Sequence, residues 1–231
     1  MTSYIQFGSK RIDFKLEYSD RKSLGITVTP DPFVVVKAPA GSSLDQVKNK
    51  LQNKAPWIIK QRNYFLSFHP KTPPRKYVSG ETHLYLGRQY RLRVVKGSSD
   101  EVKLKGKFIE VVTTNKYPVK TLLNSWYLNH AKDKFTIIAL PLIERFKKYK
   151  VEPTCIQIRE MSARWGSCTP KGKIILNPDL IRAPKACIEY VVVHELCHLV
   201  YHEHSQRFID LQTREMKDWE KWKQKLEKLL A

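Results

Sequence analysis

Residues 191–200 read Val-Val-Val-His-Glu-Leu-Cys-His-Leu-Val, an apolar stretch that carries His194, Glu195 and His198. This run predicts a buried helix. Residues four apart in a helix are rotated by about 400°, so His194 and His198 lie on one face, one turn apart. Two imidazoles at this spacing can reach one metal ion. Glu195 lies about 100° round the helix from His194, beside the ion rather than under it.

The spacing His-Glu-x-x-His is typical of zinc hydrolases in which the two histidines bind the metal and the glutamate is a general base. An isolated histidine in a helix is usually a core or surface residue. Here two histidines and a glutamate lie together in an apolar helix, and burying them without an ion would leave polar groups that need partners. The stretch therefore favours a metal site in which Glu195 takes a proton from the attacking water.

A catalytic zinc usually has three protein ligands and one open position. In a straight helix, His202 would lie about 12 Å along the axis from His194, given a rise of about 1.5 Å per residue. The two could not then share one ion with the histidine between them. His204 can reach the ion if the helix ends near Tyr201 and the chain turns back. We therefore expect His204 as the third ligand, with His202 beside the site or at the surface. Glu215, on the following predicted helix, is the alternative ligand.

The 231 residues are enough for one large or two modest domains, and a composition of 42% apolar and 11% aromatic residues can build a core. No apolar run approaches the roughly 18 residues of a membrane-spanning helix, and the first residues lack the basic-then-apolar plan of a signal peptide. We therefore expect a cytoplasmic protein without a membrane partner. The four cysteines form no C-x-x-C pair, and most are expected to be reduced, small buried residues.

The net charge of +20 is concentrated in the first two thirds of the chain. Residues 1–150 contain 29 Lys and Arg against 11 Asp and Glu, a net charge of +18, whereas residues 151–231 contain 13 against 11, a net charge of +2. A field of one sign attracts polyanions such as nucleic acid or nucleotides. Arg91 and Arg93 share one face of a predicted strand and are the best candidate surface. The alternative is a solvated basic surface that only aids solubility.

Strand patterns fill much of the chain outside the metal helix. Alternation of polar and apolar residues predicts strands at residues 11–18, 24–29, 33–36, 82–86 and 89–95, a hairpin at 101–112, and further strands at 155–159 and 173–177. Residues 4–37 are expected to form an antiparallel meander.

Two helical patterns connect these strands. One follows a capping serine, Ser42 or Ser43, and is expected to be interrupted at Pro56. The other covers residues 118–148 and is expected to kink or divide at Pro141.

The predicted fold class is α+β, in two domains. Residues 1–115 are expected to form a basic, strand-rich domain with a helical insertion. Residues 116–231 are expected to form a mixed α/β, zincin-like metallohydrolase domain that includes the connecting helix.

An ordered series of short motifs surrounds the metal helix. In the catalytic part it consists of Arg164-Trp165-Gly166-Ser167-Cys168, residues 174–177, Ala183-Pro184, residues 190–199, His204-Ser205 and Phe208. In the front part it consists of residues 85–92 and Trp126-Tyr127. Together these residues resemble the YgjP-like metallopeptidases, which are related to the SprT-like zincins. The resemblance covers most of the chain. It implies a mixed α/β catalytic domain with one zinc ion per chain, held by His194, His198 and His204, and Glu195 as the base.

The leading hypothesis is a zinc metallopeptidase that cleaves a peptide or protein substrate with water activated by the metal. The strand at residues 173–177 could run along the cleft and pair with an extended peptide. Arg164, Tyr201 and Asn177 are the candidate substrate-binding residues. Arg164 could contact an anion or a carbonyl oxygen; alternatively, residues 164–168 form a structural turn packed under the metal helix.

Two other functions fit the residues. A metal-dependent nucleotide phosphohydrolase, such as a nucleoside triphosphate pyrophosphatase, could use the same metal site and hold phosphates on the basic front part, although the sequence has no P-loop. A protease recruited to DNA could act on nucleic-acid-bound proteins, as the charge of the front part and the SprT-like relationship suggest. A non-catalytic binding module fits least well, because it would need neither the ligand set nor its glutamate.

Overall fold

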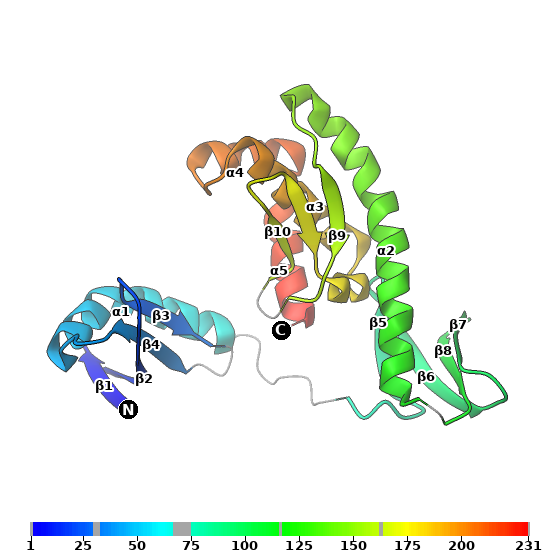
Figure 1. The fold of residues 1–231 in the computed structure, drawn as a ribbon, viewed down its shortest axis with the longest axis horizontal. Helices are drawn as coiled ribbons and strands as arrows, with labels where there is room; N and C mark the ends of the chain where they lie inside the picture. Colours follow the sequence, from blue (N-terminus) through cyan, green and yellow to red (C-terminus); the bar gives the residue numbers. More distant parts are fainter. Residues whose placement is uncertain (1, 30–32, 67–74, 116, 162–163, 231) are drawn as a thin grey trace. The chain divides into compact units, whose positions relative to one another are not determined.

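The computed structural model describes residues 2–29, 33–66, 75–115, 117–161 and 164–230. The chain divides into two compact units, unit 1 (Met1–Pro73) and unit 2 (Pro74–Leu230) (Figure 1). Each unit has its own hydrophobic core. The described residues form helices and three mixed sheets, so the predicted fold class, α+β, is confirmed.

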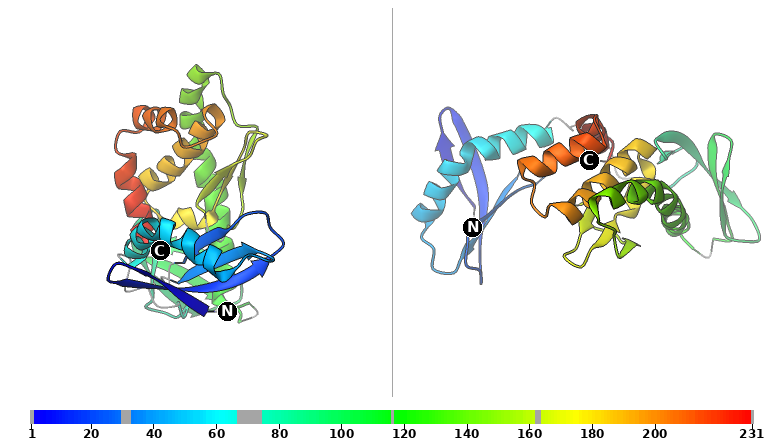
Figure 2. Two further views of the ribbon diagram at one scale, coloured as in Figure 1. Left: turned by 90° about the vertical axis from the view of Figure 1, so that its left-hand side faces the viewer. Right: turned by 90° about the horizontal axis from the view of Figure 1, so that it is seen from above.

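Unit 1 is a four-stranded sheet covered on one face by a helix. Its elements are β1 (Thr2–Phe7), β2 (Lys10–Ser19), β3 (Gly25–Val28), β4 (Val34–Pro39) and α1 (Leu44–Leu66). The strand order is β1-β2-β4-β3. Along β2, Ile12, Phe14 and Leu16 are buried while the residues between them are exposed, so one face of the sheet is apolar. Figure 2 shows α1 lying along the sheet, and Val47 and Leu51 of α1 close the core.

The first turn of α1 is fixed by a capping box. The Gln46 N–H donates to Ser43 Oγ at 3.2 Å, and the Ser43 N–H donates to Gln46 Oε1 at 3.3 Å. The helix continues through Pro56, so the interruption expected there is wrong. Proline leaves the carbonyl four residues earlier, that of Gln52, without its helical donor. Both Pro56 and Gln52 are exposed, so water can bond the freed carbonyl.

The first part of unit 2 repeats the topology of unit 1. Its strands are β5 (Thr82–Tyr85), β6 (Arg88–Lys96), β7 (Glu101–Lys105) and β8 (Phe108–Thr113), in the order β5-β6-β8-β7. In both sheets two antiparallel hairpins meet at a parallel central pair, β2 with β4 and β6 with β8. The purely antiparallel meander expected for residues 4–37 is therefore wrong. Alternation decides which face a residue occupies but not which strand lies beside it.

A long helix, α2 (Val119–Phe146), follows this sheet and continues through Pro141 without being divided. Pro141 and Ile137, whose carbonyl loses its helical donor, both lie on the exposed side, and Ile137 is 62% exposed. The helix therefore tolerates the proline where water can replace the missing hydrogen bond. Its other side carries Trp126, Phe135 and Phe146 into the core of unit 2.

The remaining elements carry the predicted metal helix. They are η1 (Lys147–Tyr149), β9 (Cys155–Ile158), β10 (Gly166–Cys168), β11 (Lys173–Leu176), η2 (Pro178–Arg182), α3 (Lys185–Val200), α4 (Gln206–Glu215) and α5 (Trp219–Leu230). The strands form a sheet in the order β10-β11-β9, in which β10 is an edge strand antiparallel to β11. α3 packs against this sheet, α2, α4 and α5. A helix that is apolar on nearly every side has to be buried in this way.

The sheet at residues 82–113 belongs with the metal helix. The N–H groups of Leu86 and Gly87 donate to carbonyls of η2 at 2.8 and 3.0 Å. A Cβ at Gly87, which has φ +78°, would lie 2.6 Å from Pro184 Cγ at the start of α3, so only glycine fits this turn. The domain boundary predicted from the sequence follows residue 115, whereas the boundary between the two compact units follows Pro73. The difference arises because this sheet shares its core with α2 and α3.

No helix within the described residues is long and apolar enough to cross a membrane. All four cysteines are free thiols; Cys187 and Cys197 are buried, whereas Cys155 is exposed.

Candidate metal centre

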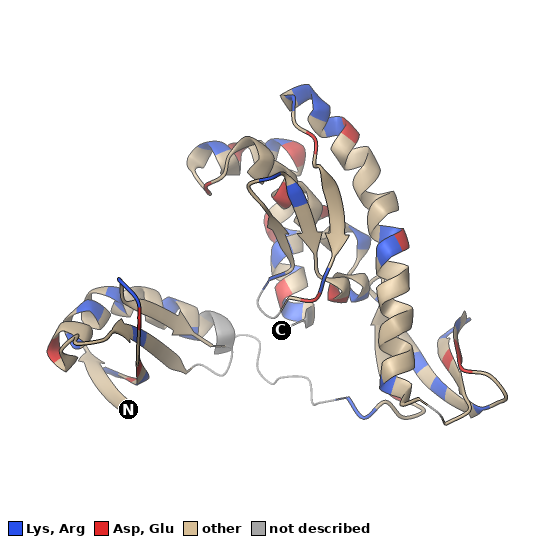
Figure 3. Cartoon of the chain, in the orientation of Figure 1, with Lys and Arg blue, Asp and Glu red and all other residues tan. Residues whose placement is uncertain are grey.

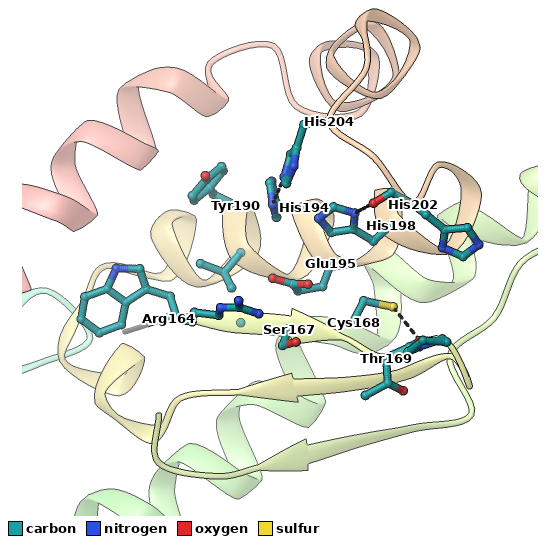
Figure 4. Close-up of a pocket in the computed structure, with 14 residues that line it drawn as sticks. Arg164, Ser167, Cys168, Thr169, Tyr190, His194, Glu195, His198, His202 and His204 are labelled. Atoms are coloured by element: carbon teal, nitrogen blue, oxygen red, sulfur yellow. Dashed lines mark hydrogen bonds between the residues drawn. The ribbon is translucent and has the colours of Figure 1, made fainter. Parts of the chain in front are cut away.

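α3 presents His194 and His198 on one face, toward a cavity (Figure 4). The helix ends one residue before Tyr201, whose backbone is extended, with φ −132° and ψ 112°. The chain then reverses ahead of α4, and the reversal brings the ring of His204 over the same face as the two helical histidines. This is the geometry that the third-ligand prediction required.

Nitrogen atoms of three histidines converge in front of α3. His194 Nε2 and His204 Nε2 are 3.1 Å apart, and one ring nitrogen from each of His194, His198 and His204 lies within 4.8 Å of the others. The ring centroids are separated by 4.6–5.0 Å. Within the described part of the chain, no other group of three potential metal-binding side chains comes this close together.

Hydrogen bonds orient the two helical histidines. His194 Nδ1 lies 2.8 Å from Gln212 Oε1, and His198 Nδ1 lies 3.1 Å from the carbonyl oxygen of His202. Because these oxygens only accept, each Nδ1 carries the proton and each Nε2 keeps its lone pair. Burial lowers the pKa of His194 to about 4 and also lowers the pKa of His198. Both rings are therefore neutral at pH 7, as metal ligands must be.

The distance between two of these nitrogens fits a bound divalent ion. Two nitrogens at about 2.0–2.1 Å from one tetrahedral zinc ion lie roughly 3.3 Å from each other. The observed 3.1 Å between His194 Nε2 and His204 Nε2 is close to this value. Three imidazole nitrogens form a donor set that suits zinc and related transition metals. The residues present therefore match a metal site with three protein ligands.

Phe208, on α4, supports the three histidine rings. Its ring centroid lies 4.7–5.1 Å from those of His194, His198 and His204, and its side chain is fully buried. Gln212 follows one helical turn later on the same face of α4. α4 therefore contributes both the packing surface and one of the hydrogen bonds that hold the cluster.

Glu195 is only 5% exposed and lies on the side of α3 that packs against β10. Burial raises the pKa of its carboxyl group to about 7, although the charge of Arg164 and a hydrogen bond from the Cys168 N–H both lower it. The Cys168 N–H therefore holds the carboxylate against β10, and Figure 4 shows the Arg164 side chain directed toward it.

Gly166, at the start of β10, makes room for this carboxylate. A Cβ at this position would lie 2.5 Å from Glu195 Oε1, 2.9 Å from Glu195 Cγ and 2.8 Å from Val191 Cγ1. Contacts this short do not occur in folded proteins, so any side chain at Gly166 would displace α3 or its glutamate. Steric contact with Glu195 and Val191 thus explains why residue 166 is a glycine.

A cavity of about 770 Å³ extends from the histidines along β10. It is lined by Arg164, Trp165, Gly166, Ser167, Cys168, Thr169, Pro170, Tyr190, Val191, His194, Glu195, His198, His202 and His204. Tyr190 stands one turn before His194 on α3 and stacks on Trp219, with 6.3 Å between centroids and an interplanar angle of 13°. The cavity therefore has aromatic walls beside a polar cluster, as enzyme pockets commonly do.

The three candidate substrate-binding residues have different positions. Arg164 lines the cavity, whereas Tyr201 and Asn177 do not. Asn177 is 5% exposed; its Nδ2 donates to the carbonyls of Met161 and Arg164 at 2.8 and 3.1 Å, and its Oδ1 accepts from the Asp179 N–H at 3.1 Å. Its side chain is occupied in holding the loop before β10, so the assignment of Asn177 to substrate does not fit the structure.

Glu215, the alternative third ligand, is engaged elsewhere. Its carboxylate accepts from Tyr149 at 2.5 Å and pairs with Arg145 at 3.0 Å and Lys148 at 2.9 Å. It is not part of the cluster found among the described residues. His202 is likewise outside the cluster, but its carbonyl holds His198 in place.

Sequence reasoning did not identify Gln212, Tyr190 or the Cys168 N–H. The signal for Tyr190 was present, because it precedes His194 by four residues and so shares its face of the helix. For Gln212, the only signal was its spacing from Phe208, which places both residues on one face of α4. Nothing local indicates that this face turns toward α3.

Residues 22–229 match the family model described as YgjP-like, metallopeptidase domain. The match covers the three histidines, Glu195 and most of both compact units. No curated protein matches the chain. The family resemblance predicted from the motifs is confirmed.

Proposed function

We propose, from the premise that the chain belongs to the YgjP-like metallopeptidase family, that it is a cytoplasmic, zinc-dependent enzyme that cleaves peptide bonds. The observation that supports this most strongly is the convergence of three histidine nitrogens near the buried carboxylate of Glu195, in one cavity. Together these are the ligands and the base that metal-assisted hydrolysis of an amide requires.

One zinc ion per chain would be held by His194, His198 and His204. When bound, zinc polarises the scissile carbonyl and makes water more acidic. Glu195 accepts a proton from the water while the water oxygen attacks the carbonyl carbon. It then transfers this proton to the leaving nitrogen as the C–N bond breaks. The hydrogen bond from the Cys168 N–H fixes the orientation of the carboxylate during both transfers.

The edge of β10 is the place where an extended peptide would bind. β11 is the central strand of its sheet and pairs on both sides, so the sequence-based proposal that residues 173–177 pair with substrate is replaced. The residues on either side of β10 are hydrogen-bonded to the chain of β11: the Asn177 N–H donates to Trp165 O, and the Thr169 N–H donates to Lys173 O. Residues bonded across an antiparallel pair alternate with residues whose backbone groups point outward. The backbone groups of Gly166 therefore face away from the sheet, beside the cavity, where strand addition can occur.

The test is a Glu195→Gln variant assayed on a peptide library by mass spectrometry. Removing the general base should lower kcat by about 10²–10⁴-fold while zinc stoichiometry stays at that of the unmodified protein. Glu203→Gln is the matched control, because Glu203 is exposed, lies between His202 and His204 and does not line the cavity. Full peptidase activity in Glu195→Gln would show that the proposed mechanism is wrong.

A nucleotide phosphohydrolase is the second candidate, and the observation that favours it is Arg164, a cation inside the cavity. A guanidinium can bind a phosphate as readily as a peptide carboxylate. Incubating the zinc-loaded protein with nucleoside triphosphates separates the two. Release of pyrophosphate that is lost in both Glu195→Gln and Arg164→Gln would favour phosphoryl chemistry, whereas peptide cleavage without nucleotide turnover would favour the peptidase.

A further inference from the structure

Charge is segregated within unit 1. On the open face of the sheet, the acidic residues of β2 are paired with basic ones: Arg11 contacts Asp13 and Lys15 contacts Glu17, each at 2.9 Å. That face is therefore close to electrically balanced. α1, in contrast, carries Lys48, Lys50, Lys54, Lys60 and Arg62 against a single acidic residue, Asp45. Within the described part of the chain, no ion pair neutralises any of these five basic residues.

Four of the exposed residues of α1 form one stripe. Lys50, Lys54, Trp57 and Lys60 are separated by four, three and three residues, so they follow one side of the helix over about 15 Å. Trp57 is 43% exposed, although a tryptophan is normally among the most buried residues of a small domain. The bands of basic residues along α1 are visible in Figure 3. We call these four residues the α1 stripe.

Amide side chains flank the α1 stripe. Asn53 and Gln61 lie four residues before and after Trp57, and Asn49 lies four residues before Asn53 in the same row. An amide both donates and accepts hydrogen bonds, which lysine cannot do. The surface therefore combines cations for phosphates, an aromatic plane for stacking and amides for the edges of bases.

We propose that the α1 stripe binds single-stranded nucleic acid. Lysines along the helix would contact phosphates, and the indole of Trp57 would stack on a base, as aromatic side chains do on surfaces that bind single strands. A duplex offers no free base face to such a ring, so it would lack this contribution. This proposal goes beyond the proposed peptidase activity and does not depend on it.

A membrane surface fits α1 less well. A helix that lies in a bilayer interface inserts a broad apolar face. The apolar face of α1, formed by Val47, Leu51, Ala55 and Ile58, is buried against the sheet. Trp57 alone cannot replace it. We therefore expect anionic vesicles not to bind α1.

The experiment measures binding of the full chain to fluorescein-labelled 12-nucleotide oligo(dT) and oligo(U) by anisotropy, across a range of salt concentrations. Lys50→Gln/Lys54→Gln removes two charges from the α1 stripe. Lys15→Gln/Lys37→Gln removes two charges from the open face of the sheet and is the matched control, because both lysines are exposed. Trp57→Phe and Trp57→Ala test stacking, with near-ultraviolet circular dichroism to verify that each variant is folded.

The proposal predicts binding that weakens with salt. In Lys50→Gln/Lys54→Gln the slope of log affinity against log salt should be shallower by about 1.4, because each phosphate that a lysine no longer neutralises reduces the slope by about 0.7. The control pair should change affinity by less than about twofold. Trp57→Ala should lower affinity by about tenfold or more and Trp57→Phe by less, with a duplex of equal charge bound more weakly than either oligomer.

Three results would overturn the proposal. One is an equal decrease in affinity in the Lys50→Gln/Lys54→Gln and Lys15→Gln/Lys37→Gln variants, which would indicate that the net charge of the chain, and not the α1 stripe, attracts the oligomer. Another is a folded Trp57→Ala variant that binds like the unmodified protein. The third is retention on vesicles of phosphatidylglycerol and phosphatidylcholine with no binding to either oligomer, which would assign α1 to lipid.

Discussion

Gln212 Oε1, on α4, lies 2.8 Å from His194 Nδ1, on α3, and the Gln212 side chain is 1% exposed. This contact decides which nitrogen of His194 faces the cluster, because a ring that donates through Nδ1 presents the lone pair of Nε2. The Nε2 of Gln212 has no hydrogen-bond partner, so the buried amide is held by this one acceptor contact and by packing. The packing of α4 against α3 is therefore needed to orient His194.

Replacing Gln212 with leucine should weaken zinc binding by about 10–100-fold, because His194 loses the acceptor that orients it. Competition with a chromophoric chelator measures this directly. Gln212→Glu is the matched control: it keeps an acceptor of the same length and removes the unpartnered amide donor. Its zinc affinity should equal or exceed that of the unmodified protein. Equal affinity in Gln212→Leu and the unmodified protein would show that the contact has no role in positioning.

Gly166→Ala should reduce turnover by at least about tenfold while leaving zinc affinity unchanged. The added Cβ would lie 2.5 Å from Glu195 Oε1, and small displacements of a catalytic group have large kinetic costs. The three atoms nearest to this methyl group belong to Glu195 and Val191, not to a histidine. Steady-state kinetics together with zinc titration separate the two effects. A variant with normal kcat would mean that the glutamate can move away from β10 without cost.

Glu215→Gln should lower the stability of unit 2 without releasing metal. Although burial raises it, the hydrogen bond from Tyr149 and the charges of Lys148 and Arg145 hold the pKa of Glu215 below its ordinary value. Breaking a buried, charge-assisted network costs about 1–3 kcal/mol of unfolding free energy. Glu144→Gln, which removes an exposed partner of Lys147, should cost far less. Denaturant unfolding and zinc titration are the measurements; loss of zinc in Glu215→Gln would restore it as a ligand.

The stability of the folded protein should decrease as the pH is lowered below 6.5, because the side chain of His83 is buried and only 1% exposed. Its Nδ1 accepts from Arg75 at 3.0 Å and its Nε2 donates to Glu81 at 3.3 Å, so a second proton on the ring would face the guanidinium. Burial and Arg75 lower the pKa of His83 from 6.5 to about 4, although Glu81 opposes them.

Between pH 6.5 and pH 4, His83 therefore binds a proton in the unfolded chain but not in the folded chain. The free energy of unfolding decreases as the pH falls through this range. The contribution of this residue at pH 5 is on the order of 2 kcal/mol. Urea unfolding of the unmodified protein and His83→Gln at pH 7 and pH 5 isolates it, since other groups titrate in both. Equal losses in the two proteins between these pH values would contradict the assignment.

Local spacing was enough to predict the two helical histidines and their glutamate. His194 and His198 lie four residues apart in an apolar run, and the geometry of one helix fixes their relation. Helical rise also excluded His202 as a ligand. His204 was expected because the chain could end the helix near Tyr201 and turn back. The family resemblance and the α+β class were likewise available from motifs and alternation.

Contacts between distant elements could not be predicted in this way. Whether Gln212 or Glu215 faces the cluster depends on how α4 packs on α3, which no local pattern specifies. Pro56 was expected to interrupt its helix and Pro141 to kink or divide its own. Each lies on an exposed side, where water can replace the one missing hydrogen bond, and neither helix is divided. The sheet at residues 82–113 joined unit 2 because Gly87 packs against Pro184, a contact between residues far apart in sequence.

The most direct test of the three-histidine site is the zinc content, measured by mass spectrometry, of the unmodified protein, His204→Ala and His202→Ala after reconstitution and removal of free metal. His202 is the matched control, because it is two residues from His204 and exposed, and its alanine variant keeps the carbonyl that holds His198. We expect about one zinc per chain in the unmodified protein and in His202→Ala, and loss of zinc in His204→Ala. An unmodified protein that stays empty, or a His204→Ala variant that keeps its zinc, would contradict the three-histidine site.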